Sequence, residues 1–188
     1  MVLSGRQGIF SMESDSELIE SINNGDTEAF ERLYYRYRDW IYRLAWRFTG
    51  NNSDALDVLQ ETFTYLLGKF PGFELTSSVT TFLYPAVRHI SITISSKKNK
   101  LKSEENILIE PQEPASQETE VYRSELVAVL AILPEEQREV LLMRFVDDMS
   151  LNEIAAAMNI PLGTVKSRLH NSLQTLRSDR RTKDYFLE

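Results

Sequence analysis

The chain contains no cysteine and only two histidines among its 188 residues. Without cysteine it can form neither disulfide bonds nor thiolate metal sites, which fits a reducing compartment and predicts a cytoplasmic protein. The two histidines, His89 and His170, lie far apart along the chain. Because no nucleophile–base pair, metal-ligand cluster or glycine-rich phosphate loop is recognisable, we expect neither an enzyme nor a bound metal or other cofactor.

Long hydrophobic runs are absent as well. No apolar segment approaches the length of a membrane-spanning helix, and the amino terminus has no signal-peptide pattern, so we expect no membrane insertion. Acidic residues outnumber basic residues by 28 to 21, which gives a net charge of -7. That balance argues against indiscriminate coating of nucleic acid, but it permits a local basic face on an acidic body.

The most specific pattern lies between Ser150 and Leu173. Ser150 and Glu153 form a capping box, which predicts a short helix that begins at Leu151. The side chains expected on its buried face are Leu151, Ile154, Ala155 and Met158. Asn159 follows where the chain must turn sharply, and asparagine tolerates the left-handed conformation better than most residues.

A second helix is expected to open near Pro161 and to run to about Arg177. Its buried stripe at helical spacing consists of Val165, Leu169, Leu173 and Leu176. The two helices and their turn predict a helix-turn-helix. The polar residues left on or near its outer face suit a helix that lies in the major groove of DNA, and they are Thr164, Lys166, Ser167, Arg168, His170 and Asn171. The alternative is an αα-hairpin with an ordinary solvated basic face.

The amino-terminal half is predicted to be helical too. Ser14 and Glu17 form a capping box for a short helix, and Asp26 caps a long helix that ends near Gly50. A third helix is expected from about Asn52 to Leu67. We expect its inward face to be Leu56, Leu59, Phe63 and Leu67. We expect its outward, acidic and polar face to be Asp54, Asp57, Gln60, Glu61 and Thr64.

A loop over residues 69–78 carries two phenylalanines that look exposed, Phe70 and Phe73. The helix after it is expected from about Ser78 to Ile94, followed by a basic end over residues 95–102. Pro85 lies inside this helix, where it must cause a kink or mark a new start.

Residues 103–119 combine glutamates and prolines without periodicity, which is typical of an extended linker. We therefore predict an all-α protein, with two small helical domains joined by an acidic flexible linker. The first domain covers residues 14–102 and the second, which contains the helix-turn-helix, covers 120–178. Residues 1–13 and 179–188 are expected to be tails. In the second domain, one helix starts near Glu120 and another opens at Pro134 and runs to Phe145.

Four segments carry a resemblance to a known family: DVLQETF (57–63), LPEEQREVLLMRF (133–145), SLNEIA (150–155) and PLGTVKSRL (161–169). They resemble bacterial RNA polymerase sigma factors of the sigma-70 family, in its extracytoplasmic-function group. The resemblance covers roughly residues 15–100 and 120–178. It implies a transcription initiation factor whose partners are core RNA polymerase (its β′ clamp and β flap), promoter DNA and an anti-sigma factor.

The resemblance also implies roles for individual residues. The first domain would dock on the polymerase and open the minus-ten element, and the second would read the minus-thirty-five element. The polymerase-binding residues would be Asp54, Asp57, Val58, Gln60 and Glu61. Opening a duplex needs pockets that hold unstacked bases, beside a basic protein surface that follows the backbone of the separated strand. The residues expected to supply them at the minus-ten element are Phe73, Arg88, His89, Lys97 and Lys98.

The chain departs from the family pattern at FLYPAVRH (82–89), where Pro85 replaces an arginine, and in the sparser basic cluster that follows. A proline in a helix interior costs about 3 kcal/mol unless a kink relieves it. Two other functions therefore stay open: a stand-alone helix-turn-helix regulator that binds operator DNA without polymerase, and an interaction-only sigma-like protein. The acidic linker is equally open to two interpretations, a mimic of nucleic acid in a basic channel or a solvated spacer.

Overall fold

A computed structural model describes residues 13–102, 129–180 and 182, and the side chains of these residues except 98–102. Every regular element among them is an α-helix, which confirms the predicted all-α class for this part of the chain. The chain divides into two compact units, Met1–Ser95 and Ser96–Glu188, and each is described by itself. The predicted linker and residues 120–128 of the helix expected near Glu120 lie outside the described residues.

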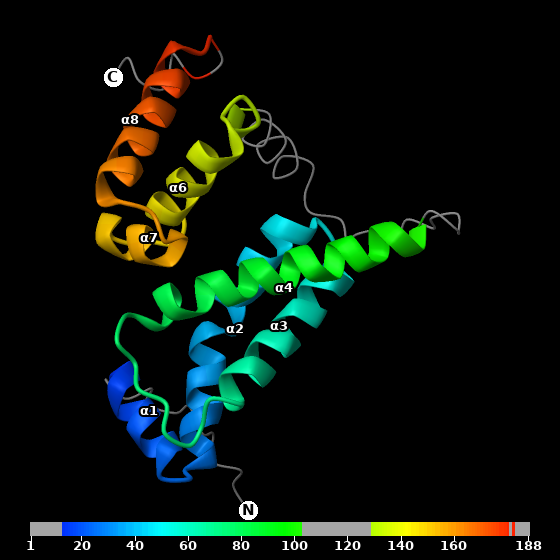
Figure 1. Ribbon diagram of the computed structural model, residues 1–188, viewed down its shortest axis with the longest axis vertical. Helices are drawn as coiled ribbons and strands as arrows, with labels where there is room; N and C mark the ends of the chain where they lie inside the picture. Colours follow the sequence, from blue (N-terminus) through cyan, green and yellow to red (C-terminus); the bar gives the residue numbers. More distant parts are fainter. Residues whose placement is uncertain (1–12, 103–128, 181, 183–188) are drawn as a thin grey trace, which may run out of the picture. The chain divides into compact units, whose positions relative to one another are not determined.

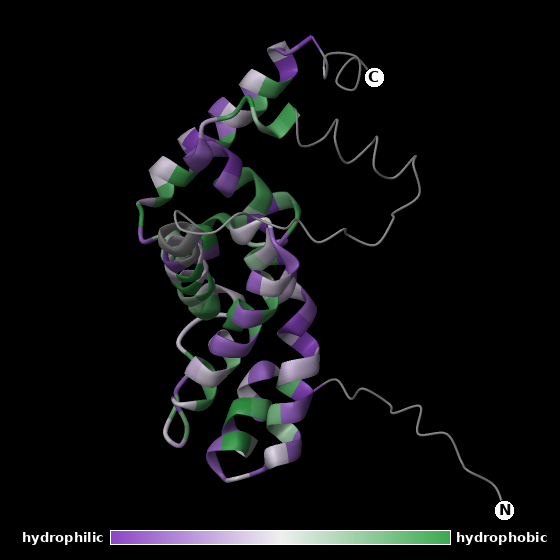
Figure 2. Ribbon diagram, turned by 90° about the vertical axis from the view of Figure 1, so that its right-hand side faces the viewer, coloured by the Kyte–Doolittle hydropathy of each residue, from purple (hydrophilic) through white to green (hydrophobic). Residues whose placement is uncertain are grey.

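The first unit is built on a long central helix. Its elements are α1 (Asp15–Asn23), α2 (Thr27–Thr49), α3 (Asn52–Leu67) and α4 (Val79–Lys102), and α4 continues beyond the end of this unit at Ser95. Helices α1 and α3 pack beside α2, and α4 lies across α2 and α3 (Figure 1). Ring contacts of Phe48 with Tyr84 and of Tyr65 with Phe82 join α4 to those two helices. The helices are amphipathic, with hydrophobic and hydrophilic residues recurring along each of them (Figure 2).

The predicted helix starts are confirmed at α1 and α2. Ser14 and Glu17 form the capping box of α1, in which the Ser14 hydroxyl accepts from the Glu17 N–H at 3.3 Å. Asp26 caps α2 by accepting from the backbone N–H of Glu28 at 2.9 Å and of Ala29 at 3.2 Å. Helix α2 ends at Gly50, whose φ of 62° is the left-handed conformation that glycine adopts without strain.

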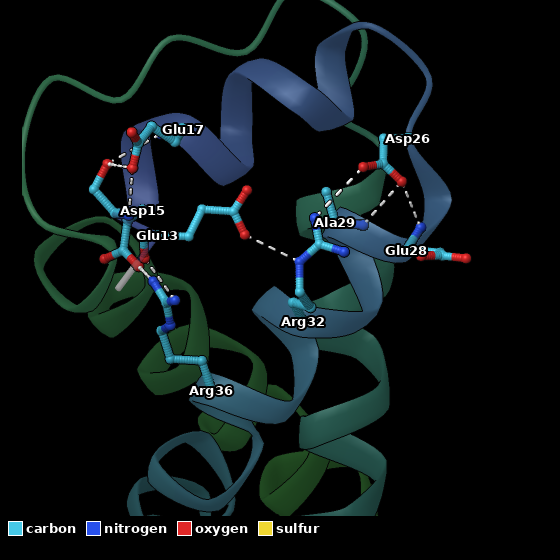
Figure 3. Close-up of polar contacts among 9 residues, drawn as sticks. Glu13, Asp15, Glu17, Asp26, Glu28, Ala29, Arg32 and Arg36 are labelled. Carbon is cyan, nitrogen blue, oxygen red and sulfur yellow. Dashed lines mark hydrogen bonds and ion pairs between the residues drawn. The ribbon is translucent and has the colours of Figure 1, made fainter. Parts of the chain in front are cut away.

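Helix α1 is held on α2 by apolar and charged contacts. Leu18, Ile19 and Ile22 of α1 are buried. Arg32 of α2 pairs with Glu13 at 3.1 Å, and Arg36 pairs with Asp15 at 2.6 Å (Figure 3). The Tyr37 hydroxyl also donates to Asp15, and burial together with this bond raises the pKa of Tyr37. Helix α1 therefore has a defined position relative to α2.

The capping box makes the start of α1 sensitive to acid. The Ser14 backbone N–H and its hydroxyl donate to the Glu17 carboxylate at 2.7 and 2.8 Å, and they lower the pKa of Glu17. A carboxylate with a lowered folded-state pKa stabilises the fold above its ordinary titration range, and this contribution is lost as pH falls through the lowered value. We expect thermal denaturation between pH 6 and about pH 3 to show a smaller acid destabilisation for Glu17→Gln than for the unchanged chain.

The exposed neighbour Glu20 offers a matched control on the same helix. Glu20→Gln should keep the acid response of the unchanged chain. An identical response of Glu17→Gln and Glu20→Gln would contradict the assignment to the capping box.

The predicted inward face of α3 was wrong in part. Leu56 and Leu67 are 52% and 53% exposed, whereas Val58 and Leu66 are buried. Of the expected residues only Phe63 lies in the core, and Leu59 is half-buried. The other buried residues of α3 are Asp54, Ala55 and Thr62. Both stripes obey helical spacing, so the choice between them depends on the surfaces of α2 and α4 and not on periodicity.

Helix α4 is longer than predicted and passes through Pro85 as one element (Figure 1). Pro85 therefore marks no new start. Its side chain is exposed, while Leu83, Tyr84 and Val87 around it are buried. Because proline has no N–H, it cannot donate to the carbonyl of Thr81 one turn earlier.

The second unit holds α6 (Glu135–Phe145), α7 (Leu151–Met158) and α8 (Leu162–Ser178). Helix α6 has the bounds predicted from Pro134. Helix α8 packs on both α6 and α7. A buried cluster of Leu133, Leu141 and Leu176 is covered by the half-buried Leu169 and Leu173 of α8. With Val165 also buried, the expected inward stripe of α8 is confirmed.

Candidate nucleic-acid interface

The turn between α7 and α8 has the geometry expected of a helix-turn-helix. Ser150 and Glu153 form the predicted capping box at the start of α7. Asn159 ends α7 with φ 53° and ψ 47°, the predicted left-handed turn. The Ile160 N–H donates to the Ala155 carbonyl at 3.0 Å and closes the turn. One detail differs: on α7 the fully buried residues are Ile154 and Ala157, and the expected Leu151, Ala155 and Met158 are half-buried.

The outer face of α8 carries most of the predicted DNA-contacting residues. Four of them are exposed: Lys166, Ser167, His170 and Asn171. Thr164 is half-buried at the first turn, where its carbonyl accepts from the Ser167 hydroxyl at 3.0 Å. The four exposed side chains supply one fixed positive charge, an imidazole, a hydroxyl and an amide, which are the donors and acceptors that base edges and phosphates recognise.

Arg168 differs from the other predicted contacts. Its guanidinium forms an ion pair with Glu136 of α6, and its side chain is only 20% exposed. Glu136 lies 32 residues earlier, so local sequence gave no signal of this pairing. The ion pair orients Arg168 towards α6, and a contact of Arg168 with DNA would have to compete with Glu136.

In the loop between α3 and α4, residues 68–78, the prediction for Phe73 was wrong. Phe73 was expected to be exposed, but it is 9% exposed and packs on Phe70 and Phe82 at ring-centroid distances of 5.5 and 4.8 Å. An apolar ring beside other aromatic rings gains more by burial than by facing water. The exposed residues of this loop include Pro71, Gly72, Glu74, Thr76 and Ser77.

Helix α4 places the remaining residues predicted for the minus-ten element. His89 and Lys97 are exposed, and Arg88 is half-buried. The side chain of Lys98 lies outside the described part of the structure. The basic residues of this set thus span at least two turns of one helix, in its middle and towards its carboxy-terminal end.

The outward face of α3 is the second polar surface of the first unit. Asp57, Gln60, Glu61 and Thr64 are exposed as predicted. Two residues of the predicted polymerase-binding set are not accessible: Asp54 is 5% exposed and Val58 is 0% exposed. The exposed Leu56 and Leu67 lie at the two ends of this face, and the sequence analysis had assigned both to the core.

The described residues form neither a candidate metal site nor a candidate membrane span. No group of three or more histidine, aspartate or glutamate residues in this part of the chain is arranged to hold a metal ion. Among the described helices, none combines the length and hydrophobicity that crossing a membrane requires.

Comparison with known proteins agrees with this layout. The family model of sigma-70 region 2 matches residues 33–100, and that of sigma-70 region 4 matches residues 123–176. The RNA polymerase sigma-E factor of Streptomyces coelicolor is 30% identical over 164 residues, which cover 85% of this chain and 90% of that protein. The ECF RNA polymerase sigma factor SigW of Bacillus subtilis is 29% identical over 178 residues, which cover 87% of this chain and 95% of SigW.

The chain belongs to the extracytoplasmic-function group of the sigma-70 family. It is an RNA polymerase sigma factor, as its sequence motifs had indicated. The first unit of the sigma factor contains region 2, and the second contains region 4.

Solved structures show the same fold. The sigma factor aligns with CnrH, in its complex with the cytosolic domain of CnrY, with a TM-score of 0.65 and 18% identity over 86% of this chain and 93% of CnrH. It aligns with RpoE of Bartonella quintana, in complex with the anti-sigma factor NepR, with a TM-score of 0.60 and 20% identity over 80% and 96% of the two chains.

Proposed function

We propose that this sigma factor directs core RNA polymerase to promoters by dividing the work among three surfaces. The exposed face of α3 docks on the polymerase, the α3–α4 loop and α4 engage the opened minus-ten element, and α8 reads the minus-thirty-five duplex. The proposal includes an anti-sigma partner, because solved structures of the same fold are complexes with such proteins.

The observation that carries the proposal is the exposed face of α8 directly after the left-handed turn at Asn159. A helix-turn-helix presents the first turns of its second helix to the major groove. Lys166, Ser167, His170 and Asn171 lie in those turns, and all are exposed. With Arg168 paired to Glu136, these four residues and Thr164 form the candidate reading set.

The docking surface is supported by its composition. Asp57 and Glu61 are one turn apart and both are exposed, so they present two negative charges on one side of α3. Leu56 and Leu67 flank them with exposed apolar surface. A charged centre beside apolar area is suited to a partner with basic and apolar groups, because charge complementarity orients the encounter and apolar burial adds affinity.

The proposed minus-ten surface combines polar residues of the α3–α4 loop with basic residues of α4. Phe73 is buried and therefore supports the loop from within, so the exposed polar loop residues are the ones available to an unstacked base. Lys97 and His89 are exposed further along α4 and suit the phosphates of a single strand. The match of region 2 to residues 33–100 favours this function over a stand-alone regulator, which would need no such domain.

Run-off transcription with purified core polymerase tests the proposal. We expect transcripts that require both this chain and a promoter selected by it. A chain that shifts operator DNA by itself, yet yields no transcript with core polymerase, would instead support the stand-alone regulator. A chain that binds core polymerase but initiates nowhere would support the interaction-only protein.

A further inference from the structure

Asn23, the last residue of α1, makes three hydrogen bonds to the α3–α4 loop. Its Oδ1 accepts from the backbone N–H of Gly72 at 2.7 Å and of Phe73 at 3.1 Å. Its Nδ2 donates to the Phe73 carbonyl at 2.8 Å. One side-chain amide thus satisfies three backbone groups of a segment about fifty residues further along the chain. Figure 1 shows this loop running past α1 before it reaches α4.

These bonds hold the loop where it has little regular structure of its own. Gly72 has a φ of 92°, a conformation open mainly to glycine, and no regular element lies between Leu67 and Val79. A loop without a ladder of backbone bonds depends on side chains to satisfy its polar groups and to select one conformation. Here the amide of Asn23 supplies those bonds on one side, and the packing of Phe73 on Phe82 supplies apolar contact on the other.

Asn23 is itself well placed to act as an anchor. Ile22 beside it is buried, and the ion pairs of Arg32 and Arg36 hold the beginning of α1 on α2. The position of the loop is therefore set relative to α1 and α2. Gly72 and Phe73 are the residues bonded to Asn23, so their position also determines where the exposed residues that follow them lie. These exposed residues are Glu74, Thr76 and Ser77.

We propose that Asn23 is a positioning residue for promoter opening: its amide holds the α3–α4 loop in the conformation that captures an unstacked base of the minus-ten element. This inference rests on the proposed function, in which that loop faces the opened strand. Asn23 acts through the loop and needs no contact with DNA. A small displacement of a positioned contact can cost about one to two orders of magnitude in the step that depends on it.

The test uses holoenzyme assembled from the full chain and core polymerase. For Asn23→Ala we expect promoter thymines to lose roughly tenfold in permanganate reactivity, and base preference across a panel of minus-ten variants to flatten. Competition with a second sigma factor should show core binding unchanged, and thermal denaturation should show a folded chain. Asn23→Asp keeps the acceptor for two of the three bonds, so we expect an intermediate loss. The exposed neighbour provides the matched control, Asn24→Ala, which should behave as the unchanged chain.

A loop variant separates this inference from the proposed function. If Glu74→Ala/Thr76→Ala/Ser77→Ala loses minus-ten preference while Asn23→Ala keeps it, the loop captures a base without help from Asn23, and the inference is overturned. If both variants open promoters with unchanged base preference at the minus-ten element, the loop does not capture a base, and both its proposed role and this inference are wrong. Should Asn23→Ala fail to fold, the same two measurements, permanganate reactivity and base preference at the minus-ten element, are made on Asn23→Asp. Unchanged base preference of Asn23→Asp would overturn the inference.

Discussion

Substitution of both Asp57 and Glu61 by lysine is expected to weaken binding of the sigma factor to core RNA polymerase by at least roughly tenfold. Both carboxylates are exposed on one side of α3, so their reversal places two positive charges where the proposed partner surface is basic. Like charges that face each other across an interface cost far more than the loss of one surface ion pair. The measurement is competition with a second sigma factor for a limiting amount of core polymerase.

Two further variants sharpen this experiment. The neutral pair Asp57→Asn/Glu61→Gln should lose less affinity than the lysine pair, and the deficit of the lysine pair should shrink at high salt because screening weakens the repulsion. Reversal of two exposed glutamates on other helices, Glu20→Lys/Glu31→Lys, makes the same change in net charge and should leave binding intact. If the α3 lysine pair binds core polymerase with unchanged affinity, this face of α3 is an ordinary solvated surface and not the docking site.

Removal of Lys166 or Asn171 is expected to weaken recognition of the minus-thirty-five element in two different ways. Lys166→Ala should reduce the salt slope of promoter binding by about one unit if its ammonium neutralises a phosphate, with little change in sequence preference. Asn171→Ala should lose about 1–3 kcal/mol at the base pair it contacts and relax preference at that position. Both are measured with holoenzyme on promoters that carry single substitutions in this element.

Gln174 provides the control on the same helix. It is exposed on the outer side of α8 and carries the same amide as Asn171, but it lies one turn further from the start of the helix. Gln174→Ala should keep the affinity, the salt slope and the preference of the unchanged chain. Equal losses from Asn171→Ala and Gln174→Ala would show that the reading surface extends along α8 or lies elsewhere.

The corrections to the predicted site have a common origin. Asp54 and Val58 belong to α3, the helix that contains the DVLQETF segment of the family resemblance, yet both are buried. A motif identifies the helix that contains a functional surface, whereas the packing of that helix decides which of its residues reach a partner. Phe73 shows the same limit in a loop, because its burial depends on Phe70 and Phe82, and neither polarity nor local spacing indicates that arrangement.

The sequence by itself determined the all-α class, the helix starts at Ser14, Asp26 and Ser150, the turn at Asn159 and the family. The helix starts and the turn depend on hydrogen bonds and conformational preferences among residues a few positions apart, so the local sequence encodes them. Only the tertiary structure decided which stripe of α3 is buried, that Arg168 pairs with Glu136, and that Asn23 holds the loop at Gly72 and Phe73. Each of these outcomes depends on surfaces brought together from distant parts of the chain, and several local patterns fit the same spacing until those surfaces meet.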